Sequence, residues 1–214
     1  LKHSSSTDVV DSMVKLAAFY AKDSSRYKEA AELYEQALTA AGDDDWQYPN
    51  LIHYSLGQLY LKNDPVKRGK QIQARLDLLA SFFKKLTDKT DPRPKAPITL
   101  VSEYLNAIEA SAFVQSRVNK SDVEAETVYR KVFAASDYIT REVYNVKVLE
   151  TYASTLDHYQ TLLNKLKNSA DAAKAAELGK VVHSKLEKLR QADEITRQQS
   201  NQQIPQSQTQ STSP

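Results

Sequence analysis

The sequence predicts an all-α protein, and three observations support that fold class. Apolar residues recur at steps of three and four from about Val9 to Ile195, which is the spacing of amphipathic helices. No convincing segment of the sequence alternates apolar and polar residues as a half-buried strand would. Only four glycines and seven prolines occur in 214 residues, so few positions interrupt a helix. We therefore expect about four antiparallel helix pairs, the last of them a longer helical hairpin.

The first helix pair is delimited by capping residues. We expect its first helix over about 7–22, with Thr7 or Asp8 as the N-cap. A short polar turn then leads into a second helix over roughly 26–41. Gly42 is placed to end that helix, because glycine adopts the left-handed conformation without steric penalty.

The second pair begins with a predicted helix over about 46–62. Pro49 falls in its first turn, where a missing backbone N–H has little effect. The sequence then breaks before Pro65. Asp64 can cap the next helix and Pro65 suits its first position, so we expect the fourth helix over about 65–87.

Three prolines within residues 91–97 make a stiff connection that no helix can cross. Beyond this segment the apolar spacing predicts a third pair, with helices over about 98–118 and 121–137. The last pair is longer, at roughly 140–167 and 169–196.

The last pair carries a seam like that of a coiled coil. On its first helix, apolar and aromatic residues alternate steps of three and four, and the second helix offers a complementary row. This pattern predicts an antiparallel hairpin. The seam residues are Leu149, Tyr152, Leu156, Tyr159, Leu163 and Leu166, facing Leu178, Val182, Leu186 and Leu189.

These elements suggest a division of the chain into four parts. We expect two helix pairs over 1–90, a proline-rich linker over 91–97 and two divergent helix pairs over 98–196. Residues 197–214 are mostly Gln, Ser, Thr and Pro, with Ile204 as the isoleucine available to a core. Burial of so little apolar surface cannot offset the entropy of ordering, so we expect a disordered polar tail.

The first two pairs share a pattern of small and aromatic residues. Leu16-Ala17-x-x-Tyr20 in the first pair is matched by Leu56-Gly57-x-x-Tyr60 in the second. The second helix of the first pair adds tyrosines and alanines at helical spacing. With these residues the chain resembles the tetratricopeptide repeat (TPR) family, most closely over residues 7–61. The resemblance is weaker beyond the proline-rich segment.

The resemblance implies a right-handed α-solenoid of TPR-like helix pairs. The chain departs from the family pattern, because Met13 and His53 occupy the tryptophan position and the closing proline is missing. Gly57 and Gly69 lie inside predicted helices, where glycine costs about 1 kcal/mol relative to alanine. We expect both glycines to mark close helix crossings.

In the TPR family, the first helices of successive units line a concave groove that holds a peptide or a partner helix. The resemblance places apolar and aromatic residues where some family members clamp a carboxylate with lysine, asparagine and arginine, so that clamp is absent. Residues from 147 to 157 are candidates to continue the groove: Lys147, Glu150, Ser154 and Asp157. The principal groove residues implied by the resemblance are Val14, Ala18, Leu51, Tyr54, Gln58 and Leu61, with Asp11 and Ala21 beside them.

Charge is unevenly distributed around the fourth helix. Residues 66–95 carry nine basic and three acidic side chains, although the whole chain has a formal net charge of only +2. Such a segment can form an electrostatic patch for phosphate or an acidic peptide, or simply a solvated helix face. Few aromatic residues interleave with the basic ones, which does not favour nucleic acid. The candidate patch consists of Lys67, Arg68, Lys70 and Arg75.

The sequence favours no catalytic or metal site. Cysteine is absent, which excludes disulfides, thiolate ligands and cysteine nucleophiles. The four histidines are far apart in sequence, without a second ligand at metal spacing. His53 sits where the repeat buries an aromatic residue, so we expect a packed side chain there. We predict neither catalytic residues, nor a metal, nor a cofactor.

The sequence does not determine the cellular compartment of the protein. No apolar run approaches the length of a membrane span, so we expect no transmembrane segment. The chain starts at Leu1 without a basic-then-apolar leader, as a fragment or processed product would. The lack of cysteine is compatible with a bacterial cytoplasm or a cell envelope.

Two functional hypotheses follow from these observations. The first is a non-catalytic protein–protein interaction scaffold that binds a protein or peptide in the concave groove. The alternative is a structural or assembly module that self-associates, or tethers a larger protein, through the C-terminal hairpin. A regulatory appendage of an enzyme whose catalytic domain lies elsewhere is a third interpretation.

Overall fold

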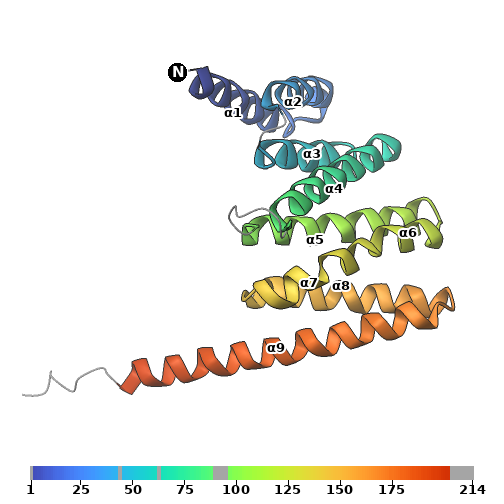
Figure 1. The fold of residues 1–214 in the computed structure, drawn as a ribbon. Coiled ribbons are helices and arrows are strands. Elements are labelled where there is room, and N and C mark those ends of the chain that lie inside the picture. Colours follow the sequence, from blue (N-terminus) through green and yellow to red (C-terminus); the bar gives the residue numbers. More distant parts are fainter. Residues whose placement is uncertain (1, 43–44, 62–63, 89–95, 203–214) are drawn as a thin grey trace, which may run out of the picture. The chain divides into compact units, whose positions relative to one another are not determined.

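The computed structural model describes residues 2–42, 45–61, 64–88 and 96–202 (Figure 1). Within these ranges the chain is helical and contains no strand, which confirms the predicted all-α class. The chain forms two compact units, residues 1–134 and 135–214, which are described separately below. The predicted linker over 91–97 lies outside the described residues except for Ala96 and Pro97.

The first unit starts with an antiparallel pair of helices, α1 (Lys2–Tyr20) and α2 (Tyr27–Ala41). A single 3₁₀ turn, η1 (Ser24–Arg26), joins them, and the Asp23 carboxylate accepts a hydrogen bond from the backbone N–H of Ser25 at 2.9 Å. The predicted start of α1 near residue 7 is wrong, because the helix already begins at Lys2. The predicted end of α2 is confirmed, since Gly42 follows it with a φ of 69°.

Small residues lie where α1 and α2 cross. Ala17, Ala30 and Ala37 are completely buried, and Tyr34 fills the space beside them with 4% of its surface exposed. The core continues into the next helix through Ile52. Small side chains let the two helix axes approach, and the tyrosine excludes water around them.

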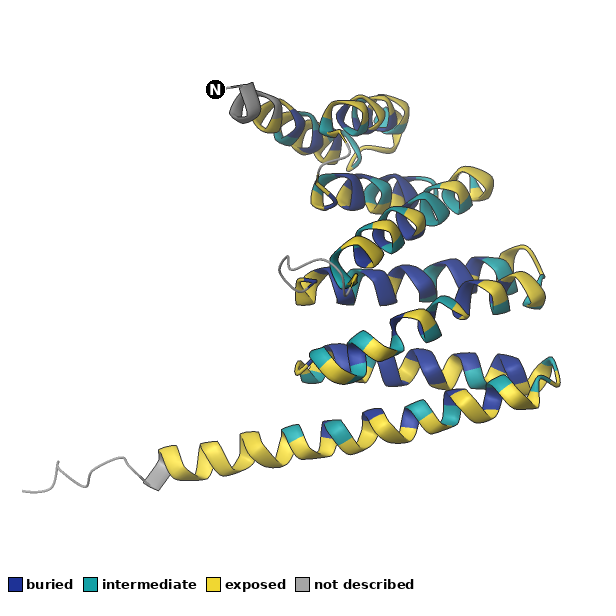
Figure 2. Cartoon of the chain, in the orientation of Figure 1, coloured by how far each residue is buried: buried dark blue, intermediate teal, exposed yellow. Residues whose placement is uncertain are grey.

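The second pair consists of α3 (Gln47–Leu59) and α4 (Pro65–Thr87). The Asp64 side chain accepts from the backbone N–H of Lys67 at 2.9 Å, so the predicted N-cap and first position of α4 are confirmed. Consecutive helices of this unit contact one another, from α1 through α4 to α5 (Ile98–Phe113). Buried residues follow the facing sides of these helices (Figure 2).

The structure corrects our interpretation of the two helix-interior glycines. A Cβ atom on Gly57 would lie 3.9 Å from Cγ1 of Ile72, and one on Gly69 would lie 3.8 Å from Cγ1 of Val114. These are ordinary van der Waals distances. The helix crossings therefore have room for a methyl group at both positions and do not require glycine.

The segment after α5 differs from the prediction. The predicted helix over 98–118 is present, but its last turn is a π-helical segment, η2 (Val114–Val118). The predicted helix over 121–137 is divided into α6 (Asp122–Tyr129) and α7 (Lys131–Glu142), with a break at Arg130. A helix of this length was expected because apolar residues keep helical spacing across the break.

The second unit is dominated by an antiparallel hairpin of α8 (Val146–Lys165) and α9 (Ser169–Gln202). The Asn145 side chain caps α8 by accepting from the backbone N–H of Val148 at 3.1 Å. This cap explains why α8 begins six residues later than predicted. α9 runs six residues beyond its predicted end at 196, so the first part of the predicted tail is helical, and residues 203–214 lie outside the described part.

The predicted seam of this hairpin is present. Its central side chains on α8 are buried, and Val182 and Leu186 are buried opposite them on α9. The outer members Leu166, Leu178 and Leu189 are half-buried. The buried residues of α8 are Leu149, Tyr152, Leu156, Tyr159 and Leu163.

Candidate functional site

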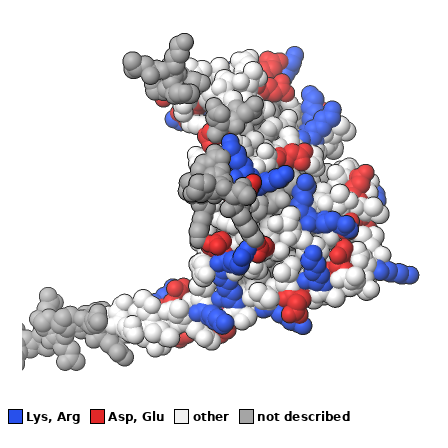
Figure 3. All heavy atoms as spheres, viewed as in Figure 1, with Lys and Arg blue, Asp and Glu red and all other residues white. Residues whose placement is uncertain are grey.

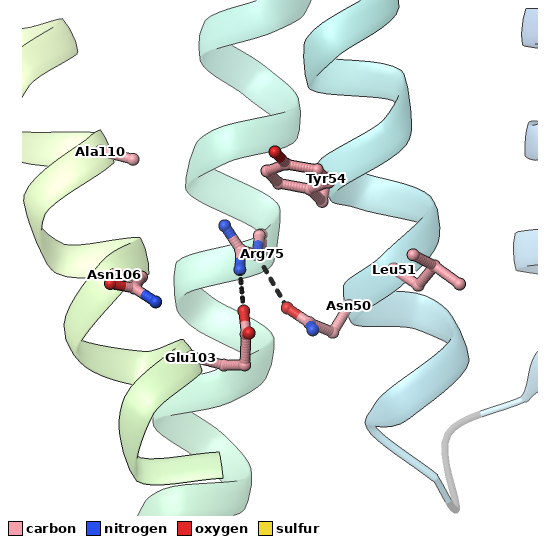
Figure 4. Close-up of a pocket in the computed structure, with 7 residues that line it drawn as sticks. All are labelled: Asn50, Leu51, Tyr54, Arg75, Glu103, Asn106 and Ala110. Carbon is pink, nitrogen blue, oxygen red and sulfur yellow. Dashed lines mark hydrogen bonds and ion pairs between the residues drawn. The ribbon is translucent and has the colours of Figure 1, made fainter. Parts of the chain in front are cut away.

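A groove with a volume of about 500 Å³ lies on the first unit, across α3, α4 and α5 (Figure 4). α3 and α5 form its two sides, and α4 forms the floor between them. Seven residues line it: Asn50, Leu51 and Tyr54 from α3, Arg75 from α4, and Glu103, Asn106 and Ala110 from α5.

Helical periodicity places these side chains on the groove. On α3, Leu51 and Tyr54 are one turn apart and therefore share a face, while Ile52 and Leu56 point into the core with no exposed surface. On α5, positions 103, 106 and 110 share a face in the same way. Each helix thus turns one face to the core and another face to the groove.

A buried arginine forms the floor of the groove. Arg75 has 8% of its surface exposed, and its Nε donates to Oδ1 of Asn50 at 2.7 Å. Its guanidinium also forms an ion pair with the Glu103 carboxylate. These contacts link α3, α4 and α5 through one side chain. A buried cation without such partners would be strongly destabilising, so the three residues form a unit.

The exposed wall of α3 is aromatic and apolar. The side chains of Tyr54 and Leu51 are 49% and 44% exposed. The Cζ atom of Arg75 lies 5.2 Å from the centroid of the Tyr54 ring, which is within range of a cation–π contact. The arginine therefore supports one face of the tyrosine, and about half of the side chain stays open to a ligand.

The structure brings together some of the predicted groove residues and separates others. Leu51 and Tyr54 line the groove, and Gln58 and Leu61 are exposed farther along the same face of α3 or just beyond its end. Ala18 is exposed on α1. Val14 is part of the hydrophobic core with 8% of its surface exposed, so its predicted place on an open groove surface is wrong.

The four residues of the predicted electrostatic patch are not all on the surface. Lys67 and Lys70 are exposed on α4, and Arg68 is half-buried. Arg75 is not part of a surface patch, because it is buried and its charge is balanced by Glu103. On the face seen in Figure 3, basic and acidic side chains alternate. The described basic side chains therefore do not form one continuous patch on that face.

Four lining residues were not predicted: Asn50, Glu103, Asn106 and Ala110. For those on α5, a signal was present in the sequence. Small or polar residues recur at helical spacing at positions 99, 103, 106 and 110 of a helix that is rich in apolar residues. The sequence alone does not show that this face lies beside α3, because that depends on how both helices pack on α4.

The second unit has a smaller polar depression of about 270 Å³ between α8 and α9. Three of the residues predicted to continue the groove, Glu150, Ser154 and Asp157, line it together with His183 and Arg190. Arg190 donates to the Glu150 carboxylate at 2.6 Å. The charges in this depression are thus partly paired within the hairpin.

The histidine and acidic residues do not gather into a metal site. Across residues 2–42, 45–61, 64–88 and 96–202, no group of three His, Cys, Asp or Glu side chains is arranged to hold a metal ion. Nδ1 of His53 lies 2.7 Å from Oε1 of Gln71 in a partly buried hydrogen bond. None of the described helices is both long enough and apolar enough to cross a bilayer.

The fold and the groove define a class of protein: an all-α chain built from consecutive, repeat-like helix pairs. A comparison with models of known protein families gives no match, and a comparison with curated protein sequences gives none either.

Proposed function

We propose that this chain is a non-catalytic interaction scaffold, a right-handed TPR-like solenoid that holds a peptide or partner helix in the groove between α3 and α5. The observation that carries the proposal is the groove's lining. The exposed Tyr54 and Leu51 lie beside the side-chain amides of two asparagines. The buried charge of Arg75 beneath them is already paired with Glu103.

This lining suits a peptide better than a reaction. Tyr54 and Leu51 offer apolar contact area, and tyrosine is enriched among the residues that dominate binding at protein interfaces. Asn106 is exposed and can donate to and accept from a peptide backbone. The lining residues that the structure describes include no histidine or cysteine as a base or nucleophile.

The resemblance to TPR repeats supports the same proposal. In that family the first helix of each unit lines the ligand groove, and α3 and α5 are the first helices of consecutive pairs here. Burial of Ala17 and Gly57 at helix contacts agrees with the small residues of the repeat pattern. Both lines of support point to the same face of α3.

A peptide-display selection tests the proposal. Peptides would be selected on the full chain and their dissociation constants measured by fluorescence anisotropy. The double variant Leu51→Ala/Tyr54→Ala should weaken binding by about 30-fold or more, because truncating hot-spot residues costs about 2 kcal/mol or more. A matched control, Val66→Ala/Val123→Ala, removes apolar side chains that are 69% and 67% exposed outside the lining.

The control variant should bind selected peptides as the unmodified chain does. The proposal would be wrong if no peptide were selected, or if both double variants bound equally well. Circular dichroism of each variant verifies that the helices are retained.

One observation favours the alternative, an assembly role for the C-terminal hairpin. Residues 191–200 of α9 are exposed along the whole stretch, and Val181 and Ile195 are exposed apolar residues on the same helix. If α9 mediates self-association, light scattering should show a dimer that Val181→Glu/Ile195→Glu converts to a monomer. A concentration-independent monomer would exclude self-association as the main role.

A further inference from the structure

The groove has an unusual balance of accessible charge. Neither α3 nor α5 contains a lysine or arginine, and the charged residues of α5 are Glu103 and Glu109. The Glu109 carboxylate accepts a hydrogen bond from the Tyr129 hydroxyl of α6 at 2.9 Å, and it does not line the groove. Glu103 is therefore the acidic group that the groove itself presents.

The one cation among the described lining residues exposes little of its surface to a ligand. Arg75 is buried, and its Nε and guanidinium are engaged by Asn50 and Glu103. A carboxylate arriving with a ligand would meet a guanidinium with little exposed surface and the negative charge of Glu103 beside it. This position therefore offers an acidic ligand little net gain.

Glu103 itself stays partly open. Its side chain is 35% exposed while it pairs with Arg75, so part of the carboxylate can meet a cation from outside. A carboxylate can accept from several donors at once, and an ammonium or second guanidinium can share it with Arg75. Tyr54 and Leu51 stand on the opposite wall with apolar surface.

From this arrangement we infer the chemistry of the partner. The groove takes a neutral-to-basic amphipathic segment that places a Lys or Arg at Glu103 and its apolar side chains against Tyr54 and Leu51. Segments with acidic side chains or a free carboxylate at this point are disfavoured. The inference rests on the proposed function, and it adds the partner's charge.

The net charge of the chain helps to distinguish a ligand preference of the groove from general electrostatic attraction. The chain has a formal net charge of +2, so unspecific attraction would favour an acidic ligand. The net charge of the chain therefore does not explain a preference for a basic ligand, and the variants below test whether the groove is its source.

The test uses two synthetic amphipathic peptides with the same leucine pattern, one with lysine and one with glutamate at every polar position. Binding to the full chain is measured by fluorescence anisotropy at about 0.15 M ionic strength, where the Debye length is about 8 Å. We expect the lysine peptide to bind more tightly, by up to about fivefold, since a partly exposed charge pair is worth up to about 1 kcal/mol.

A variant with one added cation tests whether the groove causes the preference. Asn106 is exposed on the groove wall of α5, and Asn106→Lys should narrow the preference severalfold or reverse it. Asn164→Lys adds the same charge at an exposed position of α8 and should leave the preference unchanged. Both substitutions replace an exposed polar side chain on a helix, so neither removes a core contact.

The possible outcomes distinguish a wrong charge preference from a groove that does not bind peptides. Equal binding of both peptides, preference for the glutamate peptide, or an equal response of the two lysine variants would overturn the inference about charge. If Tyr54→Ala weakened both peptides in that case, the groove would remain a binding site. Binding of neither peptide, or binding unaffected by Tyr54→Ala, would overturn the proposed function and the inference with it.

Discussion

The Nε atom of Arg75 donates to Oδ1 of Asn50 at 2.7 Å, and this hydrogen bond connects the floor of the groove to its α3 wall. Both residues are buried, at 8% and 9% exposure. The contact explains why a basic residue from the charged part of the sequence does not appear on the surface. It also positions the guanidinium beside the Tyr54 ring.

Removing the partner of this arginine should destabilise the protein. Asn50→Ala leaves the buried Nε of Arg75 without its acceptor, and an unsatisfied buried group costs about 1–3 kcal/mol. The free energy of unfolding in urea, followed by circular dichroism, measures the effect. Asn106→Ala in the same groove is the control, because this asparagine is exposed and should change stability by less than about 0.5 kcal/mol. Equal effects of the two substitutions would contradict the structural role of Asn50.

The glycine of α9 offers a stabilising substitution. A Cβ atom on Gly179 would have no heavy atom within 4 Å, and the residue lies inside a helix. Gly179→Ala should therefore raise the free energy of unfolding by about 1 kcal/mol. Gly42→Ala is the counterpart, since a φ of 69° should make alanine destabilising by about 1 kcal/mol. Thermal melting of both variants checks the opposite signs, and a destabilised Gly179→Ala would show that α9 is not packed as described.

The hairpin seam should be sensitive to truncation. Leu156 is 1% exposed on α8, and Leu156→Ala should cost about 2–5 kcal/mol through lost burial and the cavity left behind. Val181→Ala on α9 removes a side chain that is 46% exposed and should cost less than about 1 kcal/mol. Urea unfolding curves for the two variants give the comparison. Similar midpoints would mean that the seam does not hold the hairpin together.

Alkaline pH should destabilise the protein through its buried tyrosines. Burial raises the pKa of Tyr104 from 10.0 to about 12, and burial also raises the pKa of Tyr129 and Tyr152. The folded state binds these protons more tightly than the unfolded state. The resulting stability is complete below pH 10 and is lost as the pH rises from 10 toward 12. Urea midpoints measured between pH 8 and about 11.5 should fall only above pH 10. A flat profile would contradict burial of these phenols.

Much of the fold could be predicted because local chemistry determines where several helices begin and end. Gly42 and the Asp64–Pro65 pair delimit helices through their own backbone preferences, and the structure confirms both. The break at Arg130 was missed, because Tyr129 and Val132 continue the apolar spacing across it. The Asn145 cap was overlooked inside a stretch that reads as one long helix.

The candidate site was predicted on one side only. The resemblance to TPR repeats implied Tyr54 and Leu51, and both line the groove in the structure. Glu103 and Asn106 were missed, because α3 and α5 meet the groove only through their packing on α4. The prediction that Val14 lies on the groove surface was wrong. The family spacing assigns Val14 to a face of α1, but packing against neighbouring helices buries its side chain in the core.

The central claim, that the α3–α5 groove binds a peptide, is tested most directly by hydrogen exchange. Mass spectrometry would compare backbone exchange of the full chain with and without a peptide from the display selection. Bound peptide should slow exchange in residues 47–59 and 98–113, which form the two walls, and leave 146–165 unchanged. Protection confined to the C-terminal hairpin, or absent from both groove walls at saturating peptide, would contradict the account.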